Sequence, residues 1–139
     1  MNAKEKLLQK LSSLDSSGGI HRIHTALADA GFKYKGPANS QTLLYYFRSG
    51  GQEIGIAAIR GSPAVLSFPA SFWRGRSSLG AALSKASCFY IEPEDCVSSS
   101  QYSAGQLRIT TSSIEILLSI INEIIVPEAQ EAGAQAWAN

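Results

Sequence analysis

The sequence predicts a single α+β domain over residues 1–139, built on an antiparallel sheet of about five strands with helices packed mainly on one face. Three observations predict this class. The chain has the length of one domain, its middle holds three β-prone segments separated by turn residues, and apolar residues recur at helical spacing near both ends. The expected order is α-α-β-β-β-α-β-β-α. Residues 1–14 could form a peripheral helix, and residues 128–139 could form a flexible tail.

Two amphipathic helices are predicted before the sheet. Residues 3–14 carry four leucines at helical spacing, and residues 20–30 carry an apolar row on one face. Gly31 suits the left-handed position that often follows a helix. The first row is Leu7, Leu8, Leu11 and Leu14, and the second is Ile20, Ile23, Leu27 and Ala30. The segment 33–41 contains glycine and proline, so we expect it to be a loop.

A meander of three antiparallel strands is the clearest prediction from local sequence. The aromatic segment that begins at Thr42 is β-prone, and the segments 53–60 and 64–68 continue the pattern. The first two strands are joined by Ser49-Gly50-Gly51-Gln52, in which paired glycines tolerate the positive φ of a tight hairpin turn. Gly61-Ser62-Pro63 turns the chain into the third strand.

The second half of the chain is expected to extend this sheet. Residues 77–86 predict a short helix that a serine can cap, and the apolar segment 88–91 predicts a fourth strand. Residues 93–104 are rich in serine and predict a polar loop. Residues 106–110 predict a fifth strand.

The last predicted helix is unusually apolar. Ser112 and Glu115 have the spacing of a capping box, and apolar residues cover most of the helix surface from 114 to 126. Pro127 should end or kink this helix. Such a helix is either central to the core or half of a subunit interface, and the second reading predicts a homodimer through residues 114–126.

The two parts of the chain carry opposite charge although the whole chain is close to neutral. Residues 1–91 hold eleven Lys and Arg against four Asp and Glu, a net +7, while residues 92–139 hold one arginine against seven acids, a net −6. The two parts either neutralise each other within the fold or present a basic and an acidic surface to partners. No secretory signal or membrane-spanning stretch is recognisable, so the cytoplasm is the expected compartment.

No motif for catalysis, metal binding or a cofactor is recognisable, and none of these is predicted. The chain contains no Walker loop, no dinucleotide-binding glycine motif and no serine-nucleophile elbow. A metal-dependent nuclease would need several converging acids, but the second strand offers only Glu53 and the third offers none. The pair Gly18-Gly19 before a helix could cradle a phosphate, although two glycines there are more often a helix cap.

The histidines and cysteines do not form a recognisable site either. His21 and His24 are three residues apart on the second helix, without an indicated third ligand, and we interpret them as partly exposed helix residues. Cys88 and Cys96 match neither a redox motif nor a zinc spacing, and free thiols are expected. Cys88 lies in an apolar segment and is expected in the core.

These absences favour a non-enzymatic protein-interaction module, such as a small inhibitor or adaptor that binds a larger assembly, for example a nucleic-acid-processing or defence complex. The segment 68–76 combines aromatic residues with arginines, the residue types enriched at interface hot spots. The acidic turn at 92–95 could engage a basic partner, although charged turns are usually only solvated. The predicted partner-binding residues are Phe72, Trp73, Arg74, Arg76, Glu92, Glu94 and Asp95. The alternative for Phe72 and Trp73 is that they fill the core.

Two further functions stay open from sequence alone. The basic N-terminal part could bind nucleic acid through Lys33, Lys35, Arg48, Arg60, Arg74 and Arg76. Alternatively, residues scattered in sequence could assemble an enzyme or ligand site, for which a deep polar pocket near His21, His24 or Cys96 would be the sign.

Overall fold

The computed structural model describes residues 2–36, 41–61, 64–73, 96–97 and 103–133, and all described strands join one antiparallel sheet. The strand order is β1-β2-β3-β4-β6-β5. The strands are β1 (Lys33–Lys35), β2 (Thr42–Ser49), β3 (Gln52–Arg60), β4 (Val65–Pro69), β5 (Cys96–Val97) and β6 (Ser103–Arg108). The predicted α+β class and antiparallel sheet are therefore confirmed. The predicted helix at 77–86 and strand at 88–91 lie outside the described residues.

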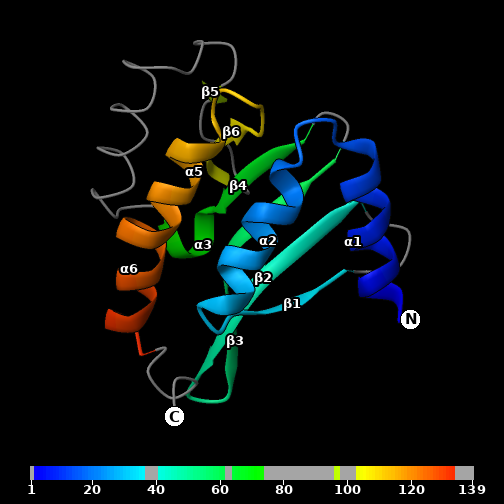
Figure 1. Ribbon diagram of the computed structural model, residues 1–139. Helices are drawn as coiled ribbons and strands as arrows, with labels where there is room; N and C mark the ends of the chain where they lie inside the picture. The colour runs from blue at the N-terminus through cyan, green and yellow to red at the C-terminus, as the bar shows by residue number, and fades with distance from the viewer. Residues whose placement is uncertain (1, 37–40, 62–63, 74–95, 98–102, 134–139) are drawn as a thin grey trace.

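The longer helices form a layer against one side of this sheet (Figure 1). Helix α2 lies across the sheet next to α5, and α1 packs beside α2 near the β1 side. The helices are α1 (Ala3–Leu14), α2 (Gly19–Asp29), α3 (Ala70–Trp73), α5 (Ile114–Ile120) and α6 (Val126–Glu131), with a π-helical turn at Ile121–Ile125 between the last two. The first two helices begin and end close to their predicted bounds. Leu11 of α1 is buried in the core, so α1 belongs to the fold and is not merely peripheral.

The central meander forms because its turn and its strands have compatible local preferences. Gly50 and Gly51 have φ of 61° and 82°, the positive values that a two-residue hairpin turn requires. Ser49 pairs with Gln52 across that turn, which confirms the predicted hairpin. Alternation along β2 then places Leu43, Tyr45 and Phe47 in the core.

The expectation of a loop at 33–41 is wrong at its start, where β1 pairs with β2. Lys33 lies opposite Tyr46, and Lys35 lies opposite Leu44. Three residues are too few to show a strand period, and β1 forms because β2 offers an unpaired edge whose N–H and C=O groups need partners. The predicted polar loop at 93–104 is likewise interrupted by β5, and β6 begins at Ser103, earlier than predicted.

The predicted capping box at Ser112 and Glu115 is also wrong. The residue before α5 is Ser113, whose hydroxyl donates to the carbonyl oxygen of Arg108 at 2.7 Å and accepts from the backbone N–H of Thr110 at 2.9 Å. Glu115 instead forms an ion pair with Arg22 of α2. Ser113 is buried, and its hydroxyl forms hydrogen bonds with backbone groups of residues 108–110 instead of capping a backbone N–H of the helix.

The apolar C-terminal helix contributes to the core. Its most deeply buried side chains follow one row, Leu117, Ile121, Ile125 and Ala129, each four residues after the last. On a regular α-helix, four residues turn about 40° past a full turn, so such a row would drift away from the sheet. The wider π turn at 121–125 reduces this drift, and Pro127, which cannot donate a backbone hydrogen bond, lies two residues after it. Pro127 therefore does not end the helical segment, which continues to Glu131.

Candidate functional site

The face of the sheet turned away from the helices gathers basic residues that are far apart in sequence. Tyr45 and Tyr34 contact His24 of α2, which assigns their side of the sheet to the helices. Side chains alternate along a strand, so their neighbours on β1 and β2 point to the opposite side. We define the basic sheet face as Lys33, Lys35, Tyr46, Arg48 and Arg60, which pairing places together on the outer side of β1, β2 and β3.

Charge on the basic sheet face is strongly one-sided. Lys33, Lys35, Arg48 and Arg60 are all exposed. The six described strands contain one acidic residue, Glu53, which lies on the same face opposite Arg48. On the described strands β1, β2 and β3, the face therefore carries four cations against one anion. Among the described residues, Lys33 and Arg60 have no ion-pair partner.

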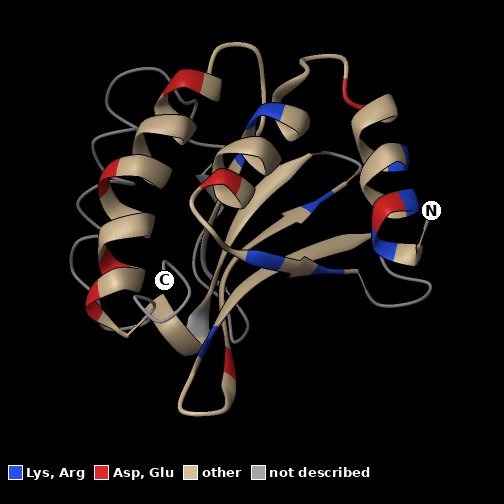
Figure 2. Ribbon diagram, turned by 60° about the horizontal axis from the view of Figure 1, so that its bottom comes forward, with Lys and Arg blue, Asp and Glu red and all other residues tan. Residues whose placement is uncertain are grey.

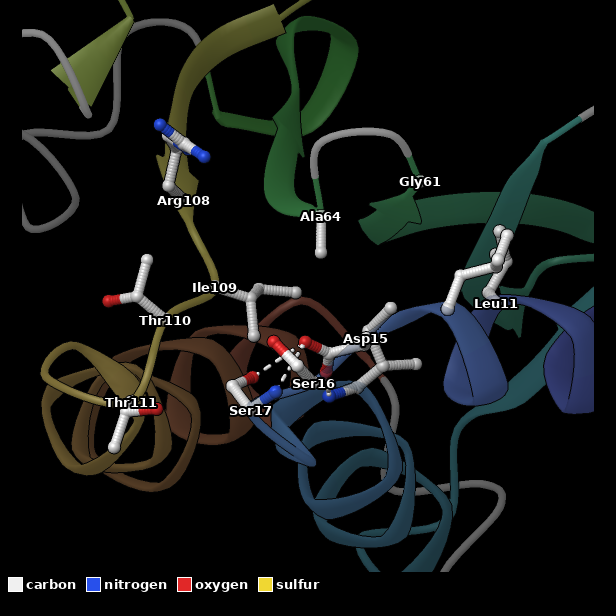
Figure 3. Close-up of a pocket in the computed structure, with 12 residues that line it drawn as sticks. Leu11, Asp15, Ser16, Ser17, Gly61, Ala64, Arg108, Ile109, Thr110 and Thr111 are labelled. Atoms are coloured by element: carbon white, nitrogen blue, oxygen red, sulfur yellow. Dashed lines mark hydrogen bonds between the residues drawn. The ribbon is translucent and has the colours of Figure 1, made fainter.

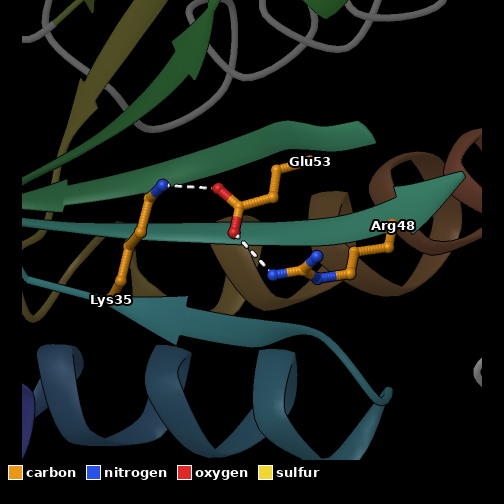
Figure 4. Close-up of polar contacts among 3 residues, drawn as sticks. All are labelled: Lys35, Arg48 and Glu53. Carbon is orange, nitrogen blue, oxygen red and sulfur yellow. Dashed lines mark hydrogen bonds and ion pairs between the residues drawn. The ribbon is translucent and has the colours of Figure 1, made fainter. Parts of the chain in front are cut away.

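Glu53 holds two of the cations in a fixed arrangement (Figure 4). One carboxylate oxygen accepts from Lys35 Nζ at 2.6 Å, and the other accepts from Arg48 Nη2 at 3.0 Å. The hydrogen bond from Lys35, together with the positive charges of Lys35 and Arg48, holds the pKa of Glu53 below its usual value. The contacts join β1, β2 and β3, so they position the two cations relative to the strands.

Tyr46 is the aromatic side chain within this basic surface. It pairs with Lys33 on β1 and with Gly55 on β3, and its side chain is partly exposed. The ammonium group of Lys35 lies 5.3 Å from the centre of the Tyr46 ring, within the range of a cation–π contact. Because Gly55 has no side chain, its position on β3 contributes no side chain next to the Tyr46 ring. The outer side of Gly55 is bordered by Leu44.

A cavity of about 350 Å³ lies between the α1–α2 turn and the chain that follows β6 (Figure 3). Its polar lining includes Asp15 and hydroxyl groups from both sides, and its apolar lining includes Leu11, Leu14 and Ile109. Leu14 has 65% of its surface exposed, more than any other large apolar residue in the described part of the chain. Neither histidine nor Cys96 lines this cavity.

Side chains of the α1–α2 turn cap the N-terminus of α2, so Gly18-Gly19 acts as part of a helix cap and not as a phosphate cradle. Asp15 accepts hydrogen bonds from the backbone N–H of Ser17 at 3.1 Å and of Ile20 at 2.9 Å, and the Ser17 hydroxyl accepts from Gly19. A carboxylate therefore occupies the position where a phosphate would sit.

The two predicted helix histidines differ in their surroundings. His21 is exposed, whereas His24 Nδ1 forms a 2.7 Å hydrogen bond with the hydroxyl of Tyr45 and packs edge-on against the Tyr34 ring. Burial, followed by the charge of His21, lowers the pKa of His24 against an opposing effect of Asp29. Burial also raises the pKa of Tyr45. This arrangement fits a neutral histidine that joins α2 to the sheet.

The predicted partner-binding residues are not brought together on a described surface. Phe72 and Trp73 are buried, and the Trp73 indole N–H donates to the carbonyl oxygen of Ile56 at 2.7 Å. Their proposed role as surface contacts is therefore wrong, and the core alternative holds for both. The other five residues, Arg74, Arg76, Glu92, Glu94 and Asp95, lie outside the described residues.

The described acids of the C-terminal part gather away from the basic sheet face. Figure 2 shows acidic positions along the C-terminal helical segment, and basic positions on α1, on β1 and on neighbouring strands. Glu115 and Glu123 are exposed positions of this segment. The Arg22–Glu115 ion pair, at 2.8 Å, links the two oppositely charged parts. The charge halves of the sequence thus meet at this pair, while the basic sheet face lies apart from the acids of the helical segment.

Sequence reasoning named Lys33, Lys35, Arg48 and Arg60 but missed Tyr46. The signal that could have found it is alternation along 42–48, which puts Tyr46 and Arg48 on the same side. Within the described ranges, no three His, Cys, Asp or Glu side chains come together as a metal site. None of the described helices has the length and apolar character needed to cross a membrane. Comparisons with protein-family models, with curated proteins and with solved structures give no significant match.

Proposed function

We propose that this chain is a non-enzymatic binding module that binds nucleic acid through the basic sheet face. One observation carries the proposal: strand pairing gathers Lys33, Lys35, Arg48 and Arg60 on one exposed face, on which the described strands β1, β2 and β3 hold a single acid. These are four of the six cationic residues that the sequence offered for this function. A row of cations on a surface is the electrostatic footprint of a phosphate-binding site.

The layout of the remaining charges supports the same partner. The acids of the C-terminal helical segment lie on the helix layer, so they do not neutralise the sheet face directly. An overall charge near zero would not attract a polyanion, but a separated basic surface steers one toward itself. Glu53 does not cancel the site, because its two partners stay exposed and face outward with Lys33 and Arg60.

The test is salt-dependent binding of short mixed-sequence oligonucleotides, single- and double-stranded, measured by fluorescence anisotropy. We expect binding that weakens between about 50 and 200 mM salt, because phosphate contacts release counterions. Lys33→Ala/Arg60→Ala should weaken binding and reduce the salt slope by about 1.4 to 1.8, at roughly 0.7 to 0.9 for each contact. These two residues are chosen because neither substitution leaves a paired carboxylate without its partner.

Lys6→Ala/Lys10→Ala is the matched control, since it removes the same charge from exposed positions of α1. It should leave the slope nearly unchanged. Equal effects of the two double variants would mean that only net charge matters and would remove the basic sheet face as the site. Absence of binding to either oligonucleotide at low salt would remove the proposal itself.

A protein-interaction module, inhibitor or adaptor, is the second candidate, and Leu14 is the observation that favours it. This leucine is largely exposed at the rim of a cavity with further apolar lining. An exposed apolar anchor beside a cavity is a typical feature of protein-binding sites. Leu14→Asp should abolish capture of such a partner while leaving oligonucleotide binding intact, and loss of both together would count against two separate surfaces.

A further inference from the structure

We propose that Tyr46 is a stacking platform for an unpaired base, so that the basic sheet face binds single-stranded nucleic acid in preference to a duplex. This inference rests on the nucleic-acid-binding function proposed above and adds the class of ligand. It assigns a role to Tyr46, which is not among the residues that the sequence indicated for nucleic-acid binding.

The position of Tyr46 within the face is the first argument. Of the aromatic residues in β1 and β2, Tyr34, Tyr45 and Phe47 lie on the helix side, and Tyr46 alone lies on the outer side. It occupies the middle of β2, between β1 and β3. Thr42 to Arg48 spans about 20 Å at the usual rise of a strand. A strand of nucleic acid that follows this row of cations would therefore pass over the Tyr46 ring.

The neighbours of Tyr46 provide the second argument. On the β3 side, Gly55 has no side chain of its own, and the Leu44 side chain of β2 borders its outer side. On the β1 side, Lys33 is its register partner and Lys35 Nζ lies 5.3 Å from the ring centre. An aromatic ring flanked by cations can contact a base while the cations contact the phosphates on either side of it.

The shape of the surface provides the third argument. Base edges in a duplex are reached by an element that enters a groove, such as a helix or a two-stranded ribbon. The basic sheet face is composed of side chains on three paired strands, and these can contact only the backbone of a duplex. A single strand exposes its bases to the same surface, and stacking on a ring accepts any base.

The experiment uses the intact chain with three probes of equal length: a single-stranded oligonucleotide, the same oligonucleotide with abasic sites, and a duplex. We expect the single strand to bind most tightly, and the abasic strand to bind about 5- to 150-fold more weakly, which corresponds to roughly 1–3 kcal/mol for one stacked base. The abasic comparison needs no variant, so it cannot be confused with a folding defect.

Tyr46→Ala should weaken single-strand binding by a similar factor without changing the salt slope, because it removes no phosphate contact. Tyr46→Phe retains the ring and should bind like the parent chain. Together, these variants separate stacking from charge, which the Lys33→Ala/Arg60→Ala variant tests.

Equal binding of the intact and abasic strands, or a duplex that binds as well as the single strand, would overturn the inference while leaving salt-dependent nucleic-acid binding in place. Displacement of the single strand by an equal charge of polyglutamate would also overturn it, because an acidic polypeptide would then satisfy the face without any base. Absence of salt-dependent binding to all three probes would instead remove the underlying function.

Discussion

Trp73 illustrates how one side chain can fit two functions until its partners are known. A tryptophan followed by an arginine is typical of a binding surface, and in this fold the indole is 1% exposed. Its ring packs edge-on against Phe68 and Phe72, and its N–H reaches the Ile56 carbonyl. Ile56 is the extra residue at the irregularity between Tyr45 and Tyr46 in the β2–β3 pairing, where the ladder leaves backbone groups to be satisfied by other partners.

His24 is the residue whose protonation should alter stability. Its folded-state pKa is lowered by burial, with a further contribution from His21 and an opposing one from Asp29, so the native state binds fewer protons than the unfolded chain. The stability that this group contributes is complete above the unfolded pKa of about 6.5 and is lost as the pH falls below it toward the folded pKa. We expect the free energy of unfolding to decrease as the pH is lowered through that window, as measured by urea denaturation at a series of pH values.

The controls for this prediction are the two single histidine variants. His24→Gln should flatten the dependence below about pH 6.5, whereas His21→Gln should retain most of it. An unchanged pH profile in His24→Gln would show that another group is responsible.

Among the elements, the β2–β3 hairpin is the one that local sequence determines most completely. Gly50 and Gly51 both have positive φ, and a Cβ atom added at either would meet no atom within 4 Å. Any cost of substitution there is therefore a backbone cost. Gly51→Val should lower the free energy of unfolding by about 1–2 kcal/mol, since an L-residue is disfavoured in this conformation by that amount.

Gly50→Asn is the matched variant for this hairpin. Asparagine followed by glycine is a preferred pair in the same turn, so its unfolding midpoint should stay close to that of the parent chain. Equal destabilisation by Gly51→Val and Gly50→Asn in a chemical denaturation series would contradict a backbone origin.

The β1 strand and the capping of α5 show why other elements could not be predicted. The segment Lys33-Tyr34-Lys35 is too short to show the alternation that predicts a strand. It is a strand because β2 provides an edge with which it forms backbone hydrogen bonds. The Ser112–Glu115 spacing is a sound capping signal, but Ser113 instead bonds the backbone of Arg108 and Thr110. In both cases the deciding partner is a backbone group, and its identity depends on packing rather than on spacing.

At the scale of the whole molecule, the apolar helical segment determines what we expect of self-association. The sequence indicates a homodimer because apolar residues cover the helix surface from 114 to 126, yet Leu117, Ile121 and Ile125 are buried within the chain. The fully exposed positions of this segment are polar and include Glu115, Ser119, Asn122 and Glu123, whereas Ile116, Leu118, Ile124 and Val126 are half-buried. The apolar surface left for a dimer is therefore smaller than the sequence pattern indicates.

We expect a monomer of 14.8 kDa by light scattering at micromolar concentration. The measurement should be repeated at low and high salt, because the basic sheet face and the acidic helical segment could attract each other between copies at low ionic strength. A dimer mass that persists at high salt would contradict this expectation and would indicate an apolar interface.

The sequence by itself determined the α+β class, the central meander with its glycine turn, both N-terminal helices and the separation of charge along the chain. These depend on period, turn chemistry and composition, which are local properties. Only the tertiary structure decided that Trp73 lies inside, that the last helix packs within its own chain, and that Tyr46 joins Lys33, Lys35, Arg48 and Arg60 on one face. The physical reason is that burial and register depend on strand pairing between distant segments, and a one-residue change of register would move every side chain of a strand to the opposite face.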